Sequence, residues 1–411
     1  MELHHTSLFL AAGLGLYILA GRVVMRSLGG ELRELVMALL NLAGIIYFVA
    51  DLGLVSNLRL FLFYVLFVVL QYIVLGLCSD HPGRPRWPAF CAPLAVFIAF
   101  RYVPDRIFTG LDYLSGGHLP VPSAPVIGIS YLAFRCSRLA LEVLNGSVPR
   151  PGLWQYLNFA FFLPTMSVGP INTYANFRRG FEAVPWEVPA GRAVLRILVG
   201  LVKYQFLSEI CNQLTYSSLL LNDYYHPWRD LPIAMVFYYL YLYCNFSGFC
   251  DMAIGGAALI GIPVPENFDR PFAARNLREF WNRWHITLSQ WMRDIVFAPL
   301  AKFLVRVLGP ARINHAVALA IFVVFVLIGI WHGVGWNFVI FGLLQALGVV
   351  ANHYYTLGLK RWLGREGFQA YLENRWIHAL AVVSTFAYFA ASLLFFANTL
   401  PEIRDIFRVL R

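Results

Sequence analysis

Residues 324–350, with the sequence VFVLIGIWHGVGWNFVIFGLLQALGVV, place a histidine, His332, inside an apolar run long enough to cross a bilayer. A membrane-spanning helix needs about 20 such residues. An imidazole buried there without partners costs free energy, and ionisable residues inside membranes tend to mark function. Gly333 and Gly335 follow, and glycines here permit a kink or a close backbone approach. The run predicts a membrane helix with a histidine of interest, although a lone buried histidine is more often structural.

The composition of the whole chain agrees with a membrane protein. Of the 411 residues, 59% are hydrophobic and only 13% are charged, whereas a soluble domain carries about 25% charge. The length of the apolar segments predicts an all-α polytopic membrane protein of about eleven transmembrane or re-entrant helices around a central cavity. The expected segments are Leu8–Met25, Leu35–Val55, Leu58–Leu77, Ala89–Val103, Val126–Leu144, Leu153–Val168, Leu195–Leu221, Leu231–Ile262, Ala316–Trp331, Val334–Tyr354 and His378–Phe396.

We expect one integral membrane domain over residues 1–411, made of N-terminal helices (1–125), a core (126–350) and C-terminal helices (351–411). Basic residues are favoured in cytoplasmic loops, so their positions predict an N-terminus outside the membrane and a cytoplasmic C-terminus. An odd number of crossings, such as eleven, satisfies this orientation. The loops and the tail that we place in the cytoplasm contain Arg22, Arg26 and Arg33 (first loop), Arg84 and Arg86 (third loop) and Arg404, Arg408 and Arg411 (tail). The second loop, placed outside, has Asp51 and a single Arg59.

The net charge of +10 is explained most simply by anchoring of loops to anionic lipid. The basic residues are scattered between apolar segments, which argues against a nucleic-acid partner but leaves an acidic protein partner open. The six cysteines form no CxxC pair, and most fall in apolar segments, where cysteine behaves as a small hydrophobic residue. We therefore expect neither a disulfide framework nor a metal site.

A polar and aromatic segment, residues 263–312, interrupts the apolar pattern and contains PENFDRPFAARNLREFWNRWHITLSQWMRDIVFAPL. Asn276 with Glu279 three residues later resembles a capping box, so we predict a helix from Asn276 to about Asp294. At 100° per residue, its polar side would carry Arg278, Asn282, His285, Ser289 and Arg293. An imidazole flanked by an amide and a hydroxyl suits acid–base chemistry. The alternatives are a structural histidine, and tryptophans that serve in core packing or an interfacial belt.

The segments FWNRWHITLSQWMRD and IWHGVGWNFVIFGLLQ resemble the two signature segments of the membrane-bound O-acyltransferase superfamily. Three upstream segments, VIGISYLAFR, FFLPTMSVGPINTYANFRR and YLYCNFSGFCDMAIGGAALIGIPVPENFDRPF, are also similar to that family and follow in the same order. The chain looks most like the bacterial branch that modifies cell-surface polymers, and within it the teichoic-acid D-alanyltransferase-like group. Asn245 replaces an aspartate frequent in the alginate type, and the Gly-Gly-Asn-Arg run of that type is missing. Both departures leave the acyl group open.

The resemblance implies an O-acyltransferase that moves a D-alanyl or acetyl group from a cytoplasmic thioester to a hydroxyl acceptor, for export to a surface polymer. It implies His332 as general base and His285 as a group that orients a substrate or stabilises charge. No bound cofactor is expected; the thioester, on an acyl carrier protein or on CoA, is a co-substrate. Expected substrate-binding residues are Asn282, Ser289, Trp281, Asn245, Ser247, Trp331 and Asn337.

The expected partners are membrane lipid, an acyl carrier protein and a periplasmic or extracellular relay acyltransferase, at the bacterial cytoplasmic membrane. Carrier proteins are acidic, so the basic and apolar stretch Ala298–Arg312 is a candidate docking surface, with Lys302, Phe303, Val305 and Arg306 as contacts. The alternative for this stretch is an amphipathic helix on the membrane surface.

Two other classes of function stay open at this point. The first is a polytopic transporter or flippase of a polymer precursor or acyl intermediate. Asp251 is the main acidic candidate for ion coupling in such a protein, although it could simply pair with a basic residue. No half-to-half repeat is visible, which argues weakly against an inverted-repeat transporter. The second class is a non-catalytic scaffold, which the two histidines disfavour.

Overall fold

The computed structural model describes residues 2–50, 54–80, 85–102, 128–166, 168–182, 188–219 and 226–409. The residues group into two compact units, which are Met1–Val199 with Phe249–Pro265, and Gly200–Gly248 with Glu266–Arg411. The single integral membrane domain in three parts, expected from the sequence, stays a prediction. Several positions used in the sequence analysis lie outside the described residues, namely Asp51, Arg84 and Arg411, together with the expected segment ends Val103, Val126 and Leu221.

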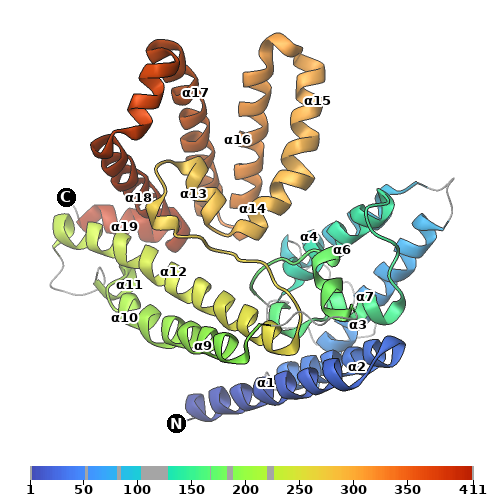
Figure 1. Ribbon diagram of the computed structural model, residues 1–411. Helices are drawn as coiled ribbons and strands as arrows, with labels where there is room; N and C mark the ends of the chain where they lie inside the picture. Colours follow the sequence, from blue (N-terminus) through green and yellow to red (C-terminus); the bar gives the residue numbers. More distant parts are fainter. Residues whose placement is uncertain are drawn as a thin grey trace, which may run out of the picture. The chain divides into compact units, whose positions relative to one another are not determined.

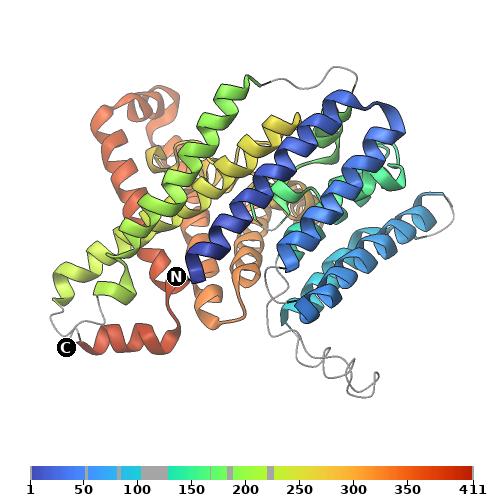
Figure 2. The ribbon, with the colours of Figure 1, turned by 90° about the horizontal axis from the view of Figure 1, so that it is seen from below.

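The first unit is built of helices that pack in neighbouring pairs. Helices α1 and α2 lie side by side, as do α3 and α4 (Figures 1 and 2). The helices are α1 (Glu2–Ser27), α2 (Gly30–Ala50), α3 (Leu54–Ser79), α4 (Trp87–Tyr102), α6 (Ile129–Leu144), α7 (Leu153–Ala160), α8 (Tyr174–Arg178), most of α9 (Ala190–Leu201) and the end of α12 (Pro227–Ile260).

Buried polar side chains join the helices of this unit. The hydroxyl of Tyr17 donates to Asn41 at 2.6 Å, and the amide of Asn41 donates to Asn158 at 2.9 Å. Arg135 is only 1% exposed. Its guanidinium donates to the carbonyl of Phe159 at 3.1 Å and to both the carbonyl and the hydroxyl of Thr165. A buried charge needs such hydrogen bonds, so Arg135 ties the motif GISYLAFR to the motif FFLPTMSVGP.

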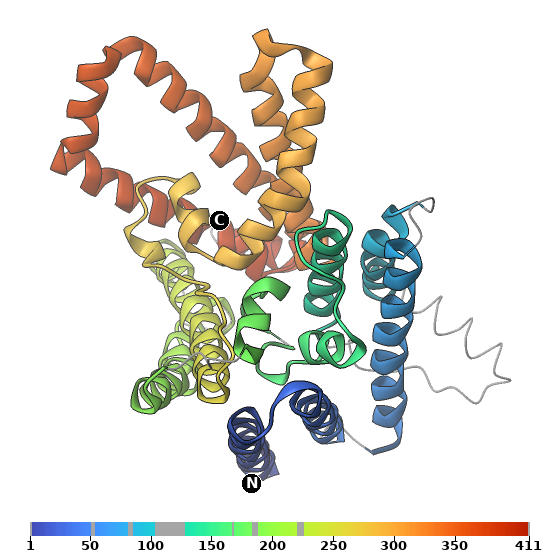
Figure 3. The same cartoon turned by 45° about the vertical axis from the view of Figure 1, so that its right-hand side comes forward.

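The second unit begins where α9 continues through a π-helical turn (Val202–Leu207) into α10 (Ser208–Asn212), followed by α11 (Tyr216–Leu219) and most of α12. Its remaining helices are α13 (Leu277–Arg283), α14 (Ile286–Met292), α15 (Ala298–Leu308), α16 (Ile313–His332), α17 (Trp336–Glu373), α18 (Arg375–Ala397) and α19 (Leu400–Val409). Helices α15 and α16 form a hairpin, and α17 bends at Gly364, which has a positive φ of 66° (Figure 3).

Five helical segments within the described residues are long and apolar enough to cross a membrane, which agrees with a multi-pass membrane protein. They are Phe61–Ser79, Trp228–Ile260, Pro310–His332, Trp336–Glu373 and Arg375–Ala397. The expected count of about eleven is not confirmed. The described part of the segment expected at Leu153–Val168 holds the eight-residue helix α7, about 12 Å long, and a short 3-10 turn, Leu163–Thr165, so it can be at most a re-entrant piece.

The continuous helix predicted from Asn276 to about Asp294 is wrong. Its start is confirmed, because the side chain of Asn276 accepts from the backbone of Glu279 at 2.9 Å. The helix then ends at Arg283. Trp284 is extended and pairs with Phe268 in an antiparallel bridge, and His285 has a left-handed backbone with φ 44°. Pairing with residues 267–269 outweighs local helix propensity here, a tertiary effect that helical periodicity does not contain.

Candidate functional site

His332 is the last residue of α16, next to a tight turn into α17. Gly333 is extended, and Gly335 precedes the first turn of α17. A Cβ added at Gly333 would lie 2.1 Å from the ring of Phe338, so any larger residue there would displace that ring. The ring of His332 is half-buried among aromatic rings, with centroid distances of 4.5 Å to Trp331, 4.8 Å to Phe396 and 6.0 Å to Phe341. The glycine turn thus positions a histidine at the end of an apolar helix.

His285 lies at the break between α13 and α14 and is only 4% exposed. Its ring packs against Phe246 of α12, with centroids 4.7 Å apart, and lies 6.2 Å from the ring of Trp331. Since Trp331 also contacts the ring of His332, one indole borders both histidines. The structure therefore brings together two histidines that stand 47 residues apart, within a single compact unit.

Burial keeps the ring of His285 neutral. His285 lies outside the five spanning segments. Burial, with a smaller contribution from the nearby His332, lowers the pKa of its imidazole from 6.5 to about 3. Nδ1 lies 3.2 Å from the side-chain oxygen of Asn267, whereas Nε2 has no hydrogen-bond partner among the described residues. A neutral, partly unsatisfied imidazole of this kind is available to accept a hydrogen bond.

The other predicted site residues divide into neighbours of the histidines and residues with bonds elsewhere. Trp331 borders both rings, and Asn245 and Ser247 flank Phe246, whose ring contacts His285. Ser247 is buried, and its hydroxyl has no partner among the described residues. Asn282, predicted to flank His285, is exposed, and Ser289 is half-buried. The helix break removes the common face on which these two residues were expected to join His285.

Trp281 and Asn337 make bonds that hold helices together. The indole of Trp281 donates to Gln345 at 3.2 Å, and Gln345 donates to Ser392 at 2.7 Å, which joins α13, α17 and α18. The amide of Asn337 donates to the carbonyl of Phe395 at 3.1 Å, a second link between α17 and α18. These contacts hold together α17 and α18, which carry Phe341 and Phe396 beside His332, and the predicted substrate contacts of Trp281 and Asn337 stay predictions.

Sequence reasoning missed the residues that hold His285. Asn267 and Thr287 are buried, and the Asn267 side-chain oxygen accepts from the backbone of Thr287 at 3.2 Å and from its hydroxyl at 2.9 Å. Asn267 stands in the PENFDRPF run, but without the bridge between Phe268 and Trp284 nothing in the sequence places it beside His285. The one signal in the sequence was an asparagine in a run bounded by two prolines, Pro265 and Pro271.

The predicted docking stretch forms the amphipathic helix α15 on the second unit. Lys302, Phe303 and Arg306 are exposed and Val305 is half-buried, and their role in carrier docking stays a prediction. Val307, which was not predicted, is 63% exposed and Phe303 is 58% exposed. The exposed face of α15 is therefore Lys302, Phe303, Arg306 and Val307.

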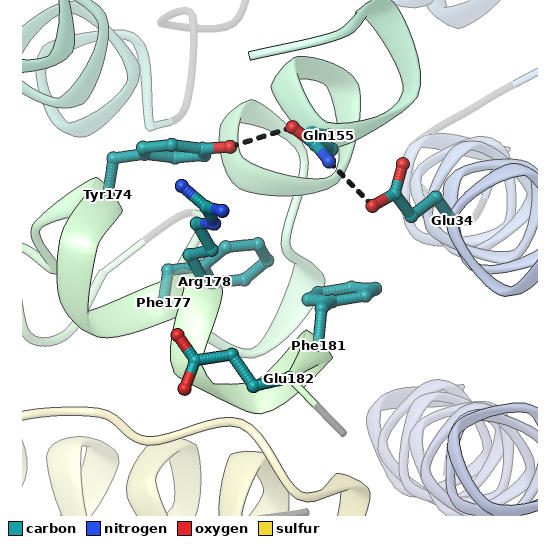
Figure 4. A pocket seen from close by; sticks show the side chains of 7 residues that line it. All are labelled: Glu34, Gln155, Tyr174, Phe177, Arg178, Phe181 and Glu182. Carbon is teal, nitrogen blue, oxygen red and sulfur yellow. Dashed lines mark hydrogen bonds between the residues drawn. The ribbon is translucent and has the colours of Figure 1, made fainter. Parts of the chain in front are cut away.

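The first unit contains a separate cavity of about 200 Å³ near the start of α2. Figure 4 shows its polar chain, in which the hydroxyl of Tyr174 donates to Gln155 at 3.0 Å and Gln155 donates to Glu34 at 2.7 Å. Phe177, Arg178, Phe181 and Glu182 complete the lining. These bonds join α2, α7 and α8, and so give the NTYANFRR motif a structural role.

Comparisons with known proteins show to which family the chain belongs. The family described as MBOAT, membrane-bound O-acyltransferase family, matches residues 129–396, a stretch that contains both histidines. The teichoic acid D-alanyltransferase of Streptococcus thermophilus is 31% identical over 67% of this chain and 69% of its own length. That of Bacillus subtilis is 28% identical over 75% of this chain and 78% of its own.

A third relative carries an O-acetylase name. The protein named "Probable alginate O-acetylase" in Azotobacter vinelandii is 28% identical over 62% of this chain and 49% of its own length. The family match covers well over half of the chain, and its relatives are named as enzymes that transfer D-alanyl or acetyl groups. The chain therefore belongs to the membrane-bound O-acyltransferase family, is an acyltransferase, and is similar within that family to the D-alanyltransferase group.

Proposed function

We propose that this protein transfers a D-alanyl or acetyl group from a cytoplasmic thioester to a hydroxyl acceptor destined for a cell-surface polymer. The observation that carries the proposal is the pair His285 and His332, bordered by one indole, that of Trp331. Both histidines fall within the family match. Relatives named as D-alanyltransferases and O-acetylases support the two candidate acyl groups.

In the proposed reaction, His332 is the general base. It takes the proton of the acceptor hydroxyl as the oxygen attacks the thioester carbonyl carbon, a role suited to an imidazole near neutral pH. The carbonyl oxygen carries negative charge in the tetrahedral intermediate. When this collapses, the carbon–sulfur bond breaks, the new ester is released, and the thiolate takes up the proton to leave as a free thiol. Direct transfer needs no acyl-enzyme.

The donor side of the proposal is an acyl carrier protein or CoA. Residues 298–312 contain Lys302, Arg306 and Arg312 but no acidic residue, and the exposed face of α15 combines two of these charges with apolar side chains. Such a face complements an acidic carrier. The accompanying proposal on location is the bacterial cytoplasmic membrane with a cytoplasmic C-terminus, with α15 on the cytoplasmic side. A relay acyltransferase outside the membrane would complete the export.

The transporter alternative loses its main acidic candidate. Asp251 lies 3.0 Å from the guanidinium of Arg196, in an ion pair between α12 and α9 within the first unit. Because Arg196 already balances the charge of Asp251, this carboxylate is less suited to bind and carry a coupling ion. Acyl transfer and transport also differ in product, because only a transferase releases free thiol from the thioester.

The test is a mass-shift assay with purified protein in detergent. D-alanyl-carrier and acetyl-CoA are each incubated with a hydroxyl acceptor extract, beside a His332→Ala variant shown to fold by its thermal unfolding profile. We expect the native protein to discharge one donor, and the variant to lose at least about 100-fold of this activity, the lower end of general-base contributions. Full activity in folded His332→Ala would refute its role, and no discharge of either donor would refute the proposed donors.

A further inference from the structure

Asn267 holds the backbone and the side chain of the segment around His285. Its backbone carbonyl accepts from the amide of Ile286 at 3.0 Å. Its side-chain oxygen accepts from the amide of Thr287 at 3.2 Å and from the hydroxyl of Thr287 at 2.9 Å. Asn267 is 1% exposed and Thr287 is 2% exposed, so these bonds are formed out of contact with bulk water.

These contacts fix which ring nitrogen of His285 carries the proton. A backbone N–H is always a donor, so the Asn267 atom that faces Thr287 has to be the carbonyl oxygen. The same oxygen lies 3.2 Å from Nδ1 of His285. Because an amide oxygen has no hydrogen to give, Nδ1 must be the donor of that bond. The ring is neutral, so its second nitrogen, Nε2, is left with a lone pair.

The Nε2 atom is the unusual feature of this arrangement. It is buried and has no hydrogen-bond partner among the described residues, although buried polar atoms are nearly always paired. The neighbouring rings of Phe246 and Trp331 offer no acceptor that would require a proton on Nε2. The lone pair on Nε2 can therefore accept a hydrogen bond from a donor group of a bound ligand.

We propose that Asn267 is a positioning residue that locks His285 as the Nδ1–H tautomer, so that Nε2 accepts a hydrogen bond from an O–H or N–H group of the substrate. This inference rests on the proposed function. It assigns His285 to orientation of a substrate, and it excludes His285 as the donor to the carbonyl oxygen in the tetrahedral intermediate, because Nε2 has no proton to give. Thr287 supports the lock by holding the Asn267 oxygen in place.

The first experiment measures the tautomer directly. The full chain in detergent, with ¹⁵N-labelled histidine, is compared with His285→Gln to assign the resonances of His285. We expect Nε2 of His285 to give the unprotonated, pyridine-type ¹⁵N signal, and Asn267→Leu to convert this signal to a mixture of tautomers. A protonated Nε2 in the native protein, or an unchanged tautomer in Asn267→Leu, would overturn the lock.

The second experiment measures acyl transfer. Asn267→Leu should lower kcat or raise one KM by about tenfold, the value of one hydrogen bond of about 1.4 kcal/mol. A raised KM for the thioester places the N–H or O–H group on the donor, and a raised KM for the alcohol places it on the acceptor. Asn352→Leu, a half-buried asparagine on α17, is the matched control and should keep native kinetics.

Asn267→Asp separates a positioning role from a merely structural one. Its carboxylate still accepts from Nδ1–H, so the tautomer is kept, but its negative charge raises the pKa of His285. His332 is the titratable neighbour whose charge opposes this shift. For Asn267→Asp we expect nearly native activity at alkaline pH. As the pH falls, activity should be lost at a higher pH than in the native protein, because His285 becomes protonated earlier. Loss at every pH would overturn the positioning role. If the native protein shows the locked tautomer but transfers no acyl group, the proposed function fails and the lock stands.

Discussion

Gly329 of α16 and Gly342 of α17 touch where these two helices cross. A Cβ placed on Gly329 would lie 2.7 Å from the Cα of Gly342 and 2.5 Å from the carbonyl oxygen of Phe338. Small residues let membrane helices approach closely, and the turn that carries His332 lies only three residues further along α16. The position of His332 therefore depends on this glycine contact.

Gly342→Ala should loosen the α16–α17 contact. The new methyl group would lie 2.8 Å from the carbonyl oxygen of Phe325, and overpacking of this kind costs about 1–3 kcal/mol. We expect a lower unfolding temperature in detergent, measured by intrinsic fluorescence. Gly358→Ala is the matched control, because it lies in the same helix and a Cβ there meets nothing within 4 Å. A Gly342→Ala variant at least as stable as Gly358→Ala would contradict the argument.

Part of this architecture can be predicted from the sequence. Features set by neighbouring residues are predictable, whereas features set by contacts between distant residues are not. Apolar length predicts α16 and α18 to within a few residues, and a local cap predicts the start of α13 at Asn276. Both signals are contained in neighbouring residues. The helix break at His285 depends on the bridge between Trp284 and Phe268, a residue 16 positions earlier in the chain. Periodicity contains no such information, so the shared face of Asn282 and His285 was predicted wrongly and Asn267 was missed.

Substitution of Arg135 should destabilise the protein far more than substitution of an exposed arginine of the first unit. Arg135→Leu leaves the carbonyls of Phe159 and Thr165 buried without their donor, and each unsatisfied group costs about 1–3 kcal/mol. Arg135→Lys keeps the charge but loses the planar fork that reaches several oxygens at once. We expect both variants to lower the unfolding temperature and the yield of monodisperse protein.

The control for Arg135 is Arg192→Leu, since Arg192 is an exposed arginine of α9. Exposed charges contribute little to stability, roughly 0–1 kcal/mol, so this variant should unfold at nearly the native temperature. Equal effects of the two leucine substitutions would mean that the hydrogen bonds of Arg135 are not what holds the motifs together.

Charge reversal on α15 tests the proposed carrier surface. Lys302→Glu with Arg306→Glu should weaken binding of an acidic acyl carrier by about tenfold or more at low salt, because complementary charge steers association. Titrations at increasing NaCl should show that the native affinity falls with salt, whereas the variant has a flat dependence. Arg361→Glu with Arg365→Glu changes the net charge equally at exposed positions of α17. If this pair weakens binding as much, the surface on α15 is not specific.

The pH dependence of His285 gives a prediction with a definite sign for activity. Its pKa is lowered from 6.5 to about 3 in the folded protein, so the ring stays neutral throughout pH 5–9. His285→Gln should therefore lower kcat without moving the acid limb of the activity profile, which belongs to another group. A shift of that limb in His285→Gln would mean that His285 titrates in the working range.

The same pKa makes a prediction for stability. Below pH 6.5 the unfolded chain binds a proton on His285 and the folded chain does not, so stability is full above this pH and falls as the pH decreases towards 3. The loss is at most about 1.4 kcal/mol per pH unit. Unfolding temperatures from pH 8 to pH 5 should therefore fall more for the native protein than for His285→Gln, which has no such proton to bind. Parallel curves would show that His285 is protonated equally in both states, and the neutral ring on which the Asn267 lock depends would then be wrong.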